Sequence, residues 1–270
     1  MTATLGVVVP ARNAASTIGS TLSAIRGASG AKLDIVVVDG ESADETAGIA
    51  KAMGARVLRR PPQGIYDAVN FGLRIAAGEW LTYINADDVL YADVLTARIE
   101  SAARHDVSYG PVDFVDHAGR HLHRWHSARP GHLLSLYRAG MSPLLQQGTL
   151  FRRAVFERLL GFDARWKLVG DADFWFRALE QGFRFQRTVA VSVAAFRMHA
   201  GQLGRIHAAE SAAEHAAMTA SHGQRGSWPG RVAAVAWRAA NWPSYARRMS
   251  RAIFSRGGSD SLGSYAVGSR

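Results

Sequence analysis

The sequence predicts an α/β fold in which helices flank a mostly parallel sheet. Short β-branched runs with the length of a buried strand alternate with segments whose apolar residues recur at helical spacing, four times within the first 90 residues. Strands that are separated by helices usually pair in parallel. Polar or acidic residues follow these runs, at the sheet edge where ligands of open α/β sheets bind. The predicted arrangement is Rossmann-like.

The first half of the chain supplies the parallel strands. Residues 5–10, 33–39, 56–59 and 80–84 predict strands, and helices are expected up to Ile25, up to Met53 and over 65–77. Gly78 ends the last of these helices, because glycine readily adopts the conformation that closes a helix. Neither a Gly-x-Gly-x-x-Gly motif after the first strand nor a P-loop motif occurs. A nucleotide would therefore need a different set of residues.

The second half predicts a mixed arrangement. A helix over 92–105 precedes a strand at 107–110 and an antiparallel hairpin of 112–115 with 121–125. Further strands are expected at 146–151 and within 183–196, and helices over 153–160 and 171–181. The tail after Trp228 predicts two short arginine-rich helices that are broken at Pro243.

Composition excludes some kinds of chemistry. The chain has 270 residues, 48% of them hydrophobic, and no cysteine, so neither a thiolate nucleophile nor a cysteine-ligated zinc is available. A chain without disulfides favours a reducing compartment. The N-terminus lacks the pattern of a signal peptide, and no apolar run reaches the roughly 20 residues that span a bilayer. We expect a cytoplasmic protein.

The basic residues concentrate in the tail. The net charge is +10, and from Arg205 onward nine arginines accompany only three acidic residues. Residues 228–256 combine arginine with tryptophan, a composition typical of a helix at an anionic membrane surface, here the inner face of the plasma membrane. A helix pair packed on the preceding domain explains the same residues, and both interpretations stay open. Residues 257–270 predict disorder.

Carboxylates follow two predicted strands and begin a later helix. Asp87 and Asp88 directly follow the strand at 80–84, where two oxygen ligands suit Mg²⁺ or Mn²⁺ carrying a phosphate. Capping of the next helix by one of them is the alternative. Asp39 ends the second strand, where acids are also common turn residues. Asp171 lies in the first turn of a predicted helix, a position that favours acids in any case.

Nine short motifs occur in order along the chain. They are Val7-Val-Val-Pro-Ala-Arg-Asn13, Val36-Val-Val-Asp-Gly-Glu-Ser-Ala-Asp44, Gln63-Gly-Ile-Tyr-Asp-Ala-Val-Asn70, Gly78-Glu-Trp80, Asn85-Ala-Asp-Asp88, Gln146-Gln-Gly-Thr-Leu-Phe-Arg-Arg153, Gly161-Phe-Asp163, Gly170-Asp-Ala-Asp-Phe-Trp175 and Phe196-Arg-Met-His199. Together they resemble the inverting family 2 glycosyltransferases of the GT-A fold, particularly those of bacterial exopolysaccharide, O-antigen and glycolipid synthesis. The resemblance implies a GT-A domain over 1–204, with a nucleotide-sugar-binding half (1–109) and an acceptor half (110–204). A basic helical tail over 205–256 follows it.

The resemblance implies a sugar donor joined to UDP, GDP or dTDP. In the family the acid after the second strand hydrogen-bonds the nucleotide base; Asp39 matches it, and a carboxylate accepts well from a ring N–H. The other residues implied to line the nucleotide-sugar site are Pro10, Ala11, Arg12, Asn13, Gly64, Tyr66, Asp67, Asn70, Asn85, Ala86 and Asp87. From the residues alone, Tyr66 as a core side chain and Asp67 as a helix cap stay open.

A divalent metal, Mg²⁺ or Mn²⁺, is also implied by the resemblance. Asp87 and Asp88 match the metal-binding motif of the family, and His199 would be either a third ligand or a hydrogen-bond donor to the diphosphate. The family motif usually begins with an acid, whereas Asn85 stands here, so metal binding rests on the two remaining carboxylates. In the family the metal takes up charge as the nucleoside diphosphate leaves.

Asp171 matches the catalytic base of the family, and Gly170 stands where the family often has Glu. A carboxylate here takes the proton of an acceptor hydroxyl, which attacks the anomeric carbon opposite the diphosphate and inverts its configuration. The implied acceptor is a glycan or a lipid-linked saccharide.

Two other functions agree less well with the sequence. A nucleotidyltransferase would need a phosphate loop rich in glycine, arginine and lysine after the first strand, which residues 10–13 do not form. A basic nucleic-acid-binding protein would carry its charge as a stripe on the folded domain, whereas much of it lies in the tail. No nucleic acid partner is therefore expected.

Overall fold

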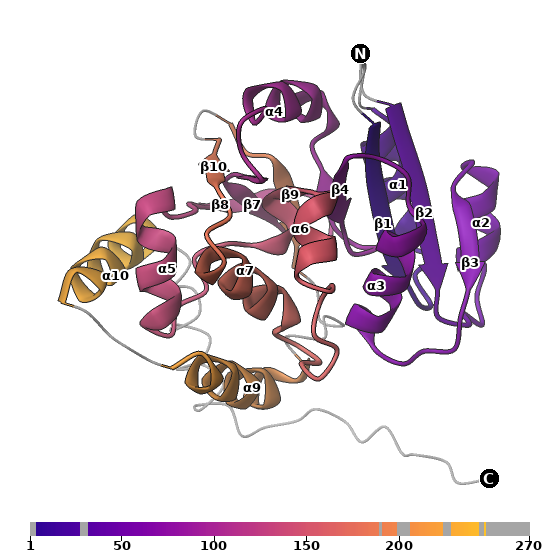
Figure 1. Ribbon diagram of the computed structural model, residues 1–270. Helices are drawn as coiled ribbons and strands as arrows, with labels where there is room; N and C mark the ends of the chain where they lie inside the picture. Colours follow the sequence, from indigo (N-terminus) through magenta and orange to yellow (C-terminus); the bar gives the residue numbers. More distant parts are fainter. Residues whose placement is uncertain are drawn as a thin grey trace, which may run out of the picture.

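The central sheet of this computed structural model has seven strands. The structure describes residues 4–27, 32–188, 191–198, 206–223, 228–242 and 246. The strands of this sheet are β1 (Thr4–Ala11), β2 (Lys32–Asp39), β3 (Arg56–Arg59), β4 (Trp80–Tyr83), β6 (Val107–Tyr109), β9 (Thr149–Arg152) and β10 (Phe185–Arg187). Their order in space is β10-β6-β9-β4-β1-β2-β3 (Figure 1).

The pairing confirms the predicted α/β fold. β1 lies between β2 and β4 and is parallel to both, and β3 is parallel to β2. β9 runs antiparallel to β4 and to β6, while β10 is parallel to β6. The first half of the chain therefore forms a parallel sheet, and the second half extends it with mixed pairing.

A second sheet of four strands brings distant segments together. Its strands are β5 (Val89–Leu90), β7 (Val112–Val115), β8 (His121–Trp125) and β11 (Ala194–Arg197). β11 pairs antiparallel with β5 and parallel with β7, and β7 forms the predicted hairpin with β8. Because β5 begins directly after Asp88, the Asp87–Asp88 pair comes to lie beside β11.

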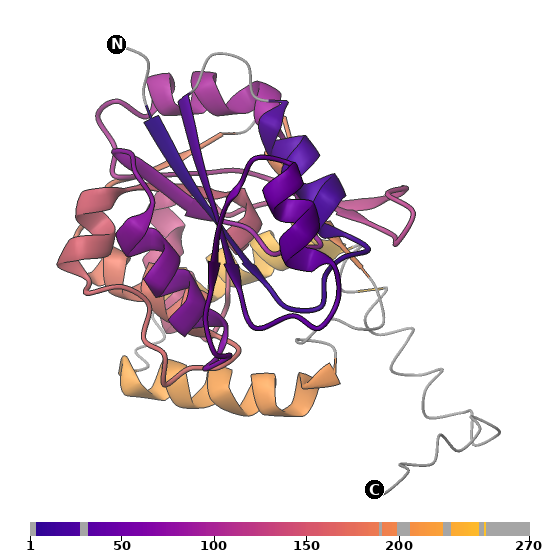
Figure 2. The same cartoon turned by 90° about the vertical axis from the view of Figure 1, so that its right-hand side faces the viewer.

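Helices cover both faces of the central sheet (Figure 2). The helices of the described residues are α1 (Ile18–Arg26), α2 (Thr46–Ala52), α3 (Ile65–Ile75), η1 (Ala92–Val94), α4 (Leu95–Ser101), α5 (Pro130–Arg138), η2 (Gln146–Gly148), α6 (Arg153–Arg158), α7 (Gly170–Glu180), α9 (Ala208–Ser221) and α10 (Trp228–Ala240). Val7 of β1 packs with Ile18 of α1 in one apolar core, and the next residue, Val8, packs with Val69 of α3 in the other. Side chains of a strand alternate between its faces, so one apolar strand supplies both cores.

Several local predictions were wrong. The strand expected at 146–151 begins only at Thr149, because Gln146–Gly148 turn as η2 and the Gln146 side chain hydrogen-bonds the carbonyl of Tyr83. The helix expected over 92–105 is split into η1 and α4 and ends at Ser101. α5 and α9 were not predicted.

α10 falls where the first tail helix was predicted. The second tail helix and residues 257–270 lie outside the described residues. Within the part of the chain that is described, no helix is both long enough and apolar enough to cross a bilayer.

Candidate active site

The loops after β1 and β2 are bonded to each other at the carboxyl edge of the sheet. The backbone N–H of Asn13 donates to Ser42 Oγ (2.9 Å), and Asn13 Oδ1 accepts from the N–H of Ala43 (2.9 Å). Asn13 has φ of 50°, a conformation that asparagine adopts more readily than most residues. The predicted residues Pro10, Ala11 and Arg12 lead into this loop, with Ala11 buried and Arg12 exposed. The two loops thus form one wall.

Asp39 ends β2 inside this wall and is fully buried. Its Oδ2 accepts from Arg59 Nε (3.2 Å) and from the N–H of Ser42 (3.3 Å). Its Oδ1 is buried and has no hydrogen-bond partner among the described residues. Buried polar atoms are nearly always paired, so we expect a hydrogen-bonding group of a ligand to pair with this oxygen.

The residues predicted on α3 are held by protein contacts. Gly64 precedes the helix with φ of 116°, which glycine adopts without strain. Asp67 accepts two hydrogen bonds from Arg60, at 2.7 and 3.0 Å. Asn70 is buried and clamps Phe162, donating to its carbonyl (2.7 Å) and accepting from its N–H (2.8 Å). Contact of these residues with a nucleotide-sugar donor stays a prediction.

Asp88 is a buried junction between three segments. Its carboxylate accepts hydrogen bonds from Gln147 Nε2 (2.8 Å), from the N–H of Arg197 (3.0 Å) and from Asn85 Nδ2 (3.1 Å). Burial, with a smaller contribution from the charge of Asp87, raises the pKa of Asp88 to about 7. The side chain therefore joins the strand end to η2 and β11. Gln147 and Arg197 both stand in the sequence motifs, but the sequence does not predict that they contact Asp88.

Asp87 and Asn85 present oxygen atoms at the same strand end. Asp87 is half-buried, and Asn85 Oδ1 is buried without a partner among the described residues. The backbone is anchored by Thr21, whose hydroxyl donates to the carbonyls of Ala86 (3.0 Å) and Asp88 (2.8 Å). A carboxylate and an amide oxygen are the hard ligands that Mg²⁺ or Mn²⁺ takes together with phosphate oxygens.

These two oxygen ligands fit a divalent ion that the substrate also helps to hold. In the described part of the chain, no three His, Asp or Glu side chains gather as a metal site of their own. Mg²⁺ in nucleotide sites commonly uses one or two carboxylates and substrate phosphates, so Asp87 with Asn85 is sufficient for such binding. His199, the predicted third ligand, lies outside the described residues.

Asp171 lies in the first turn of α7 and is partly exposed. Its Oδ1 accepts from the hydroxyl of Tyr66 (3.1 Å) and from the N–H of Ala172 (2.8 Å). Burial raises the pKa of Asp171 above its ordinary value, and these hydrogen bonds oppose the rise. Tyr66 is buried, as the core interpretation predicted, yet its hydroxyl orients Asp171. A carboxylate with a raised pKa is suited to accept a proton.

Tyr83 and Tyr66 both pack on the ring of Phe162, with centroids 5.4 and 5.7 Å away. Tyr83 ends β4 and is buried, and burial raises its pKa, with smaller contributions from Tyr66, Asp171 and Asp88. In the sequence Tyr83 has the pattern of an ordinary strand residue, so no local signal marks it.

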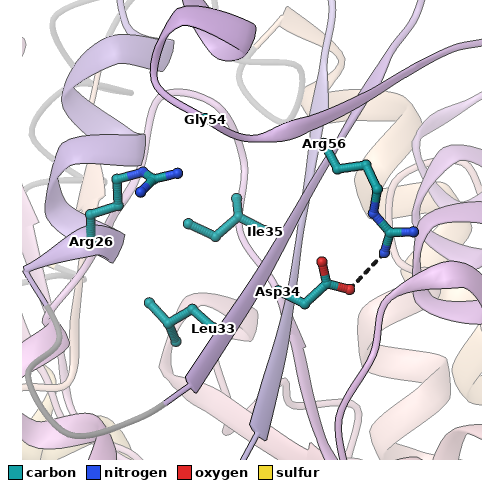
Figure 3. Close-up of a pocket in the computed structure, with 6 residues that line it drawn as sticks. All are labelled: Arg26, Leu33, Asp34, Ile35, Gly54 and Arg56. Carbon is teal, nitrogen blue, oxygen red and sulfur yellow. Dashed lines mark hydrogen bonds and ion pairs between the residues drawn. The ribbon is translucent and has the colours of Figure 1, made fainter.

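A separate hollow of about 330 Å³ lies at the opposite end of β2 (Figure 3). Arg26 and Arg56 approach it from either side, and Asp34 is bonded to Arg56 at 2.6 Å. Asp34 lies near the start of β2, whereas Asp39 ends the strand. This hollow is therefore not part of the site around Asp39, Asp87 and Asp171.

Comparison with known sequences identifies the family. Residues 6–160 match the model of glycosyl transferase family 2. A "PGL/p-HBAD biosynthesis glycosyltransferase" of Mycobacterium bovis is 30% identical over 203 residues, which cover 72% of this chain and 77% of that protein. The "Succinoglycan biosynthesis protein ExoO" of Rhizobium meliloti is 29% identical over 168 residues, covering 56% of this chain and 47% of that protein.

Solved structures share the fold at lower identity. TarS 1–349 of S. aureus in complex with UDP-GlcNAc is 19% identical, with a TM-score of 0.61 over 75% of this chain, which spans 60% of that structure. The mannosyltransferase PcManGT of Pyrobaculum calidifontis, in complex with GDP-Man and Mn²⁺, is 20% identical, with a TM-score of 0.64 over 96% of this chain and 77% of that one. The chain therefore belongs to glycosyl transferase family 2 and is a glycosyltransferase with the GT-A fold.

Proposed function

We propose that this glycosyltransferase moves a sugar from a nucleoside diphosphate to a hydroxyl group of a glycan or lipid-linked acceptor, with inversion. The observation that carries the proposal is the placement of Asp171, a partly exposed carboxylate at the start of α7 that the hydroxyl of Tyr66 and the N–H of Ala172 orient.

The donor side is built from Asp39 and the loops after β1 and β2. The free, buried Oδ1 of Asp39 suits the ring N–H of a uracil, thymine or guanine base, which matches UDP, dTDP or GDP. Neighbouring structures hold UDP-GlcNAc and GDP-Man, which supports a nucleotide-sugar donor. The loop wall formed through Asn13 would lie beside this base.

Asp87 and the Oδ1 atom of Asn85 would hold a divalent cation together with the diphosphate. When bound, such an ion supplies Lewis-acid stabilisation of the leaving diphosphate. PcManGT contains Mn²⁺ beside GDP-Man, which supports this choice. Asp88 is occupied by three protein donors, so its proposed part is to orient Asp87.

The proposed reaction uses Asp171 as the general base. Its carboxylate takes the proton of the acceptor hydroxyl while the acceptor oxygen bonds to the anomeric carbon. The bond from that carbon to the diphosphate oxygen breaks on the opposite face, so the configuration inverts. Tyr66 holds the carboxylate in place through its hydroxyl.

The acceptor is proposed to be a polysaccharide or glycolipid precursor at the inner face of the plasma membrane. The printed names of the relatives refer to PGL/p-HBAD and to succinoglycan biosynthesis. α10 exposes an apolar stripe of Val232, Val235 and, just beyond the helix, Trp242. Such a stripe on a helix that also carries the exposed Arg238 suits an anionic lipid surface.

Replacement of the base tests the reaction. Asp171→Asn keeps the size of the side chain but cannot accept the proton, so release of nucleoside diphosphate from the donor should fall by about a hundredfold or more. A panel of UDP-, GDP- and dTDP-sugars with Mn²⁺ provides the assay, and protection against thermal unfolding reports donor binding. Binding should be nearly unchanged.

Asp93→Asn is the matched control, because Asp93 is an exposed carboxylate on η1, outside the proposed site. It should behave as the wild type in both assays. If Asp171→Asn turns over the donor at the wild-type rate, the base is another group.

A further inference from the structure

α9 is packed against the half of the molecule that carries Asp171. It runs beneath α7 in Figure 1. Met218 is fully buried in the apolar core that also contains Phe176 of α7, and Thr219 is 1% exposed. His215 Nε2 lies 2.9 Å from Ser142 Oγ. This helix lies beyond residues 6–160, the part of the chain that the family model matches.

Glu214 of α9 holds the segment that leads into α7. Its carboxylate accepts hydrogen bonds from the backbone N–H groups of Lys167 (3.1 Å) and Leu168 (2.8 Å). These groups lie just before the first turn of α7, where Asp171 stands. Hydrogen bonds to a charged acceptor are stronger than neutral ones, so Glu214 restrains the approach to this turn.

His222, directly after α9, holds α7 on the other side of Asp171. Its Nε2 lies 3.0 Å from Asp173 Oδ1 and its Nδ1 lies 2.9 Å from Glu180 Oε2. The ring also stacks on Phe176, with centroids 4.2 Å apart. Ionised carboxylates only accept hydrogen bonds, so both contacts form when the imidazole is protonated and each ring nitrogen donates.

Other charged groups surround these carboxylates. Arg177 Nε donates to Asp173 Oδ2 at 2.6 Å, and an Arg138 nitrogen lies 3.9 Å from Glu180 Oε1. The hydrogen bond with Asp173 is the main cause that raises the pKa of His222, burial opposes it, and Glu180 adds to the rise. The two carboxylates of α7 therefore favour the protonated form of His222, even though each of them also contacts an arginine.

We infer that Glu214 and His222 are positioning residues, through which α9 sets the location of Asp171 relative to the donor. The inference rests on the proposed role of Asp171 as the base. Asp39, Asn85 and Asp87 stand at the ends of β2 and β4, whereas Glu214 and His222 contact residues between Lys167 and Glu180. Loss of the α9 contacts should therefore slow the transfer step and leave donor binding unchanged.

The test uses Glu214→Ala, the milder Glu214→Gln, and His222→Gln in the full chain. The assay uses the nucleotide sugar that the wild type turns over among the UDP-, GDP- and dTDP-sugars tested above. It measures the release of nucleoside diphosphate in the presence of Mn²⁺. Because a misplaced reacting group slows the chemical step, kcat should fall by about tenfold to a hundredfold while the donor KM stays the same. Glu210→Gln, at an exposed carboxylate of the same helix, should match the wild type.

The pH profile supplies a second measurement. The pKa of His222 is raised above its ordinary value of 6.5. Both hydrogen bonds from its ring to the carboxylates are therefore formed below pH 6.5, and one of them is lost as the pH rises through the raised pKa. The kcat of the wild type should decline over that range, and His222→Gln should lack this part of the decline.

Three outcomes would overturn the inference. Wild-type kcat in both the Glu214 and His222 variants, with Asp171→Asn inactive, would leave the base assigned and remove the role of α9. A donor KM that rises in parallel with the fall in kcat, together with lost thermal protection by donor, would mean general destabilisation. An active Asp171→Asn variant would overturn the base assignment first and this inference with it.

Discussion

At the scale of single residues, two of the five buried side-chain oxygens that lack partners in the described part of the chain lie at predicted ligand positions. They are Oδ1 of Asp39 and Oδ1 of Asn85. An unpaired buried polar atom costs about 1 to 3 kcal/mol, so a fold keeps few of them. Partnerless oxygens at the carboxyl edge of a parallel sheet are therefore readily explained by ligand binding. Asn85 supplies this oxygen although it replaces the usual acid.

Asp39→Asn should weaken nucleotide binding. The substitution removes the charge that strengthens a hydrogen bond to a base N–H, and such bonds contribute about 1.5 to 3 kcal/mol. The dissociation constant of UDP or GDP, measured by titration calorimetry, should rise by about tenfold or more. Asp34→Asn, at the other end of β2, is the control and should bind as the wild type. Equal affinity in the Asp39 variant would remove Asp39 from the nucleotide site.

At the scale of elements, the start of α7 depends on a glycine. A Cβ added to Gly170 would lie 2.8 Å from two carbons of the Tyr66 ring. No side chain fits there without displacing the ring, which explains why Gly170 stands where the family often has Glu. The close approach of α7 to α3 is what brings the Tyr66 hydroxyl to Asp171.

Gly170→Ala should therefore damage both stability and catalysis. Overpacking of this contact should lower the free energy of unfolding by about 1 to 3 kcal/mol, measured by urea denaturation. Donor turnover should also fall, because Tyr66 must move away from Asp171. Gly131→Ala in α5 is the matched control, since no atom lies within 4 Å of an added Cβ there. A Gly170 variant as stable and active as the control would show that the contact relaxes easily.

At the scale of the whole molecule, the C-terminal helices are part of the packed structure. α10 lies against α5, and Trp237 Nε1 donates to the carbonyl of His126 at 2.8 Å. Asn241 is fully buried; its side chain accepts from the N–H of His126 at 2.7 Å and donates to the carbonyl of His126 at 3.0 Å. The packing predicted as one alternative for the tail is thus present for α10. The predicted domain boundary near residue 205 stays a prediction.

Packing on one face leaves the opposite face of α10 for the proposed membrane contact. Val235 is 68% exposed and Trp242 is 58% exposed. Val235→Glu combined with Trp242→Ser should reduce co-sedimentation with phosphatidylglycerol vesicles, because apolar area and charge attraction are both lost. Leu160→Glu, at an exposed apolar residue elsewhere, is the control. Unchanged vesicle binding in the α10 variant would leave packing as the only role of this helix.

The sequence by itself determined the α/β fold and the family. Strand and helix periodicities are local signals, and the motifs between residues 7 and 199 keep their order along the chain, so no spatial information was needed. The positions of Asp39, Asp87 and Asp171 at the ends of strands or the start of a helix were also predicted, because those ends are visible in the local pattern.

Only the tertiary structure decided what each of these side chains contacts. Gln147 and the backbone of Arg197 reach Asp88 from segments 59 and 109 residues away, and Glu214 reaches Leu168 from 46 residues away. Such contacts depend on how sheets and helices pack, which no local periodicity encodes. For the same reason η2 replaced a predicted strand start: the Gln146 side chain bonds Tyr83, a tertiary contact that overrides local preference.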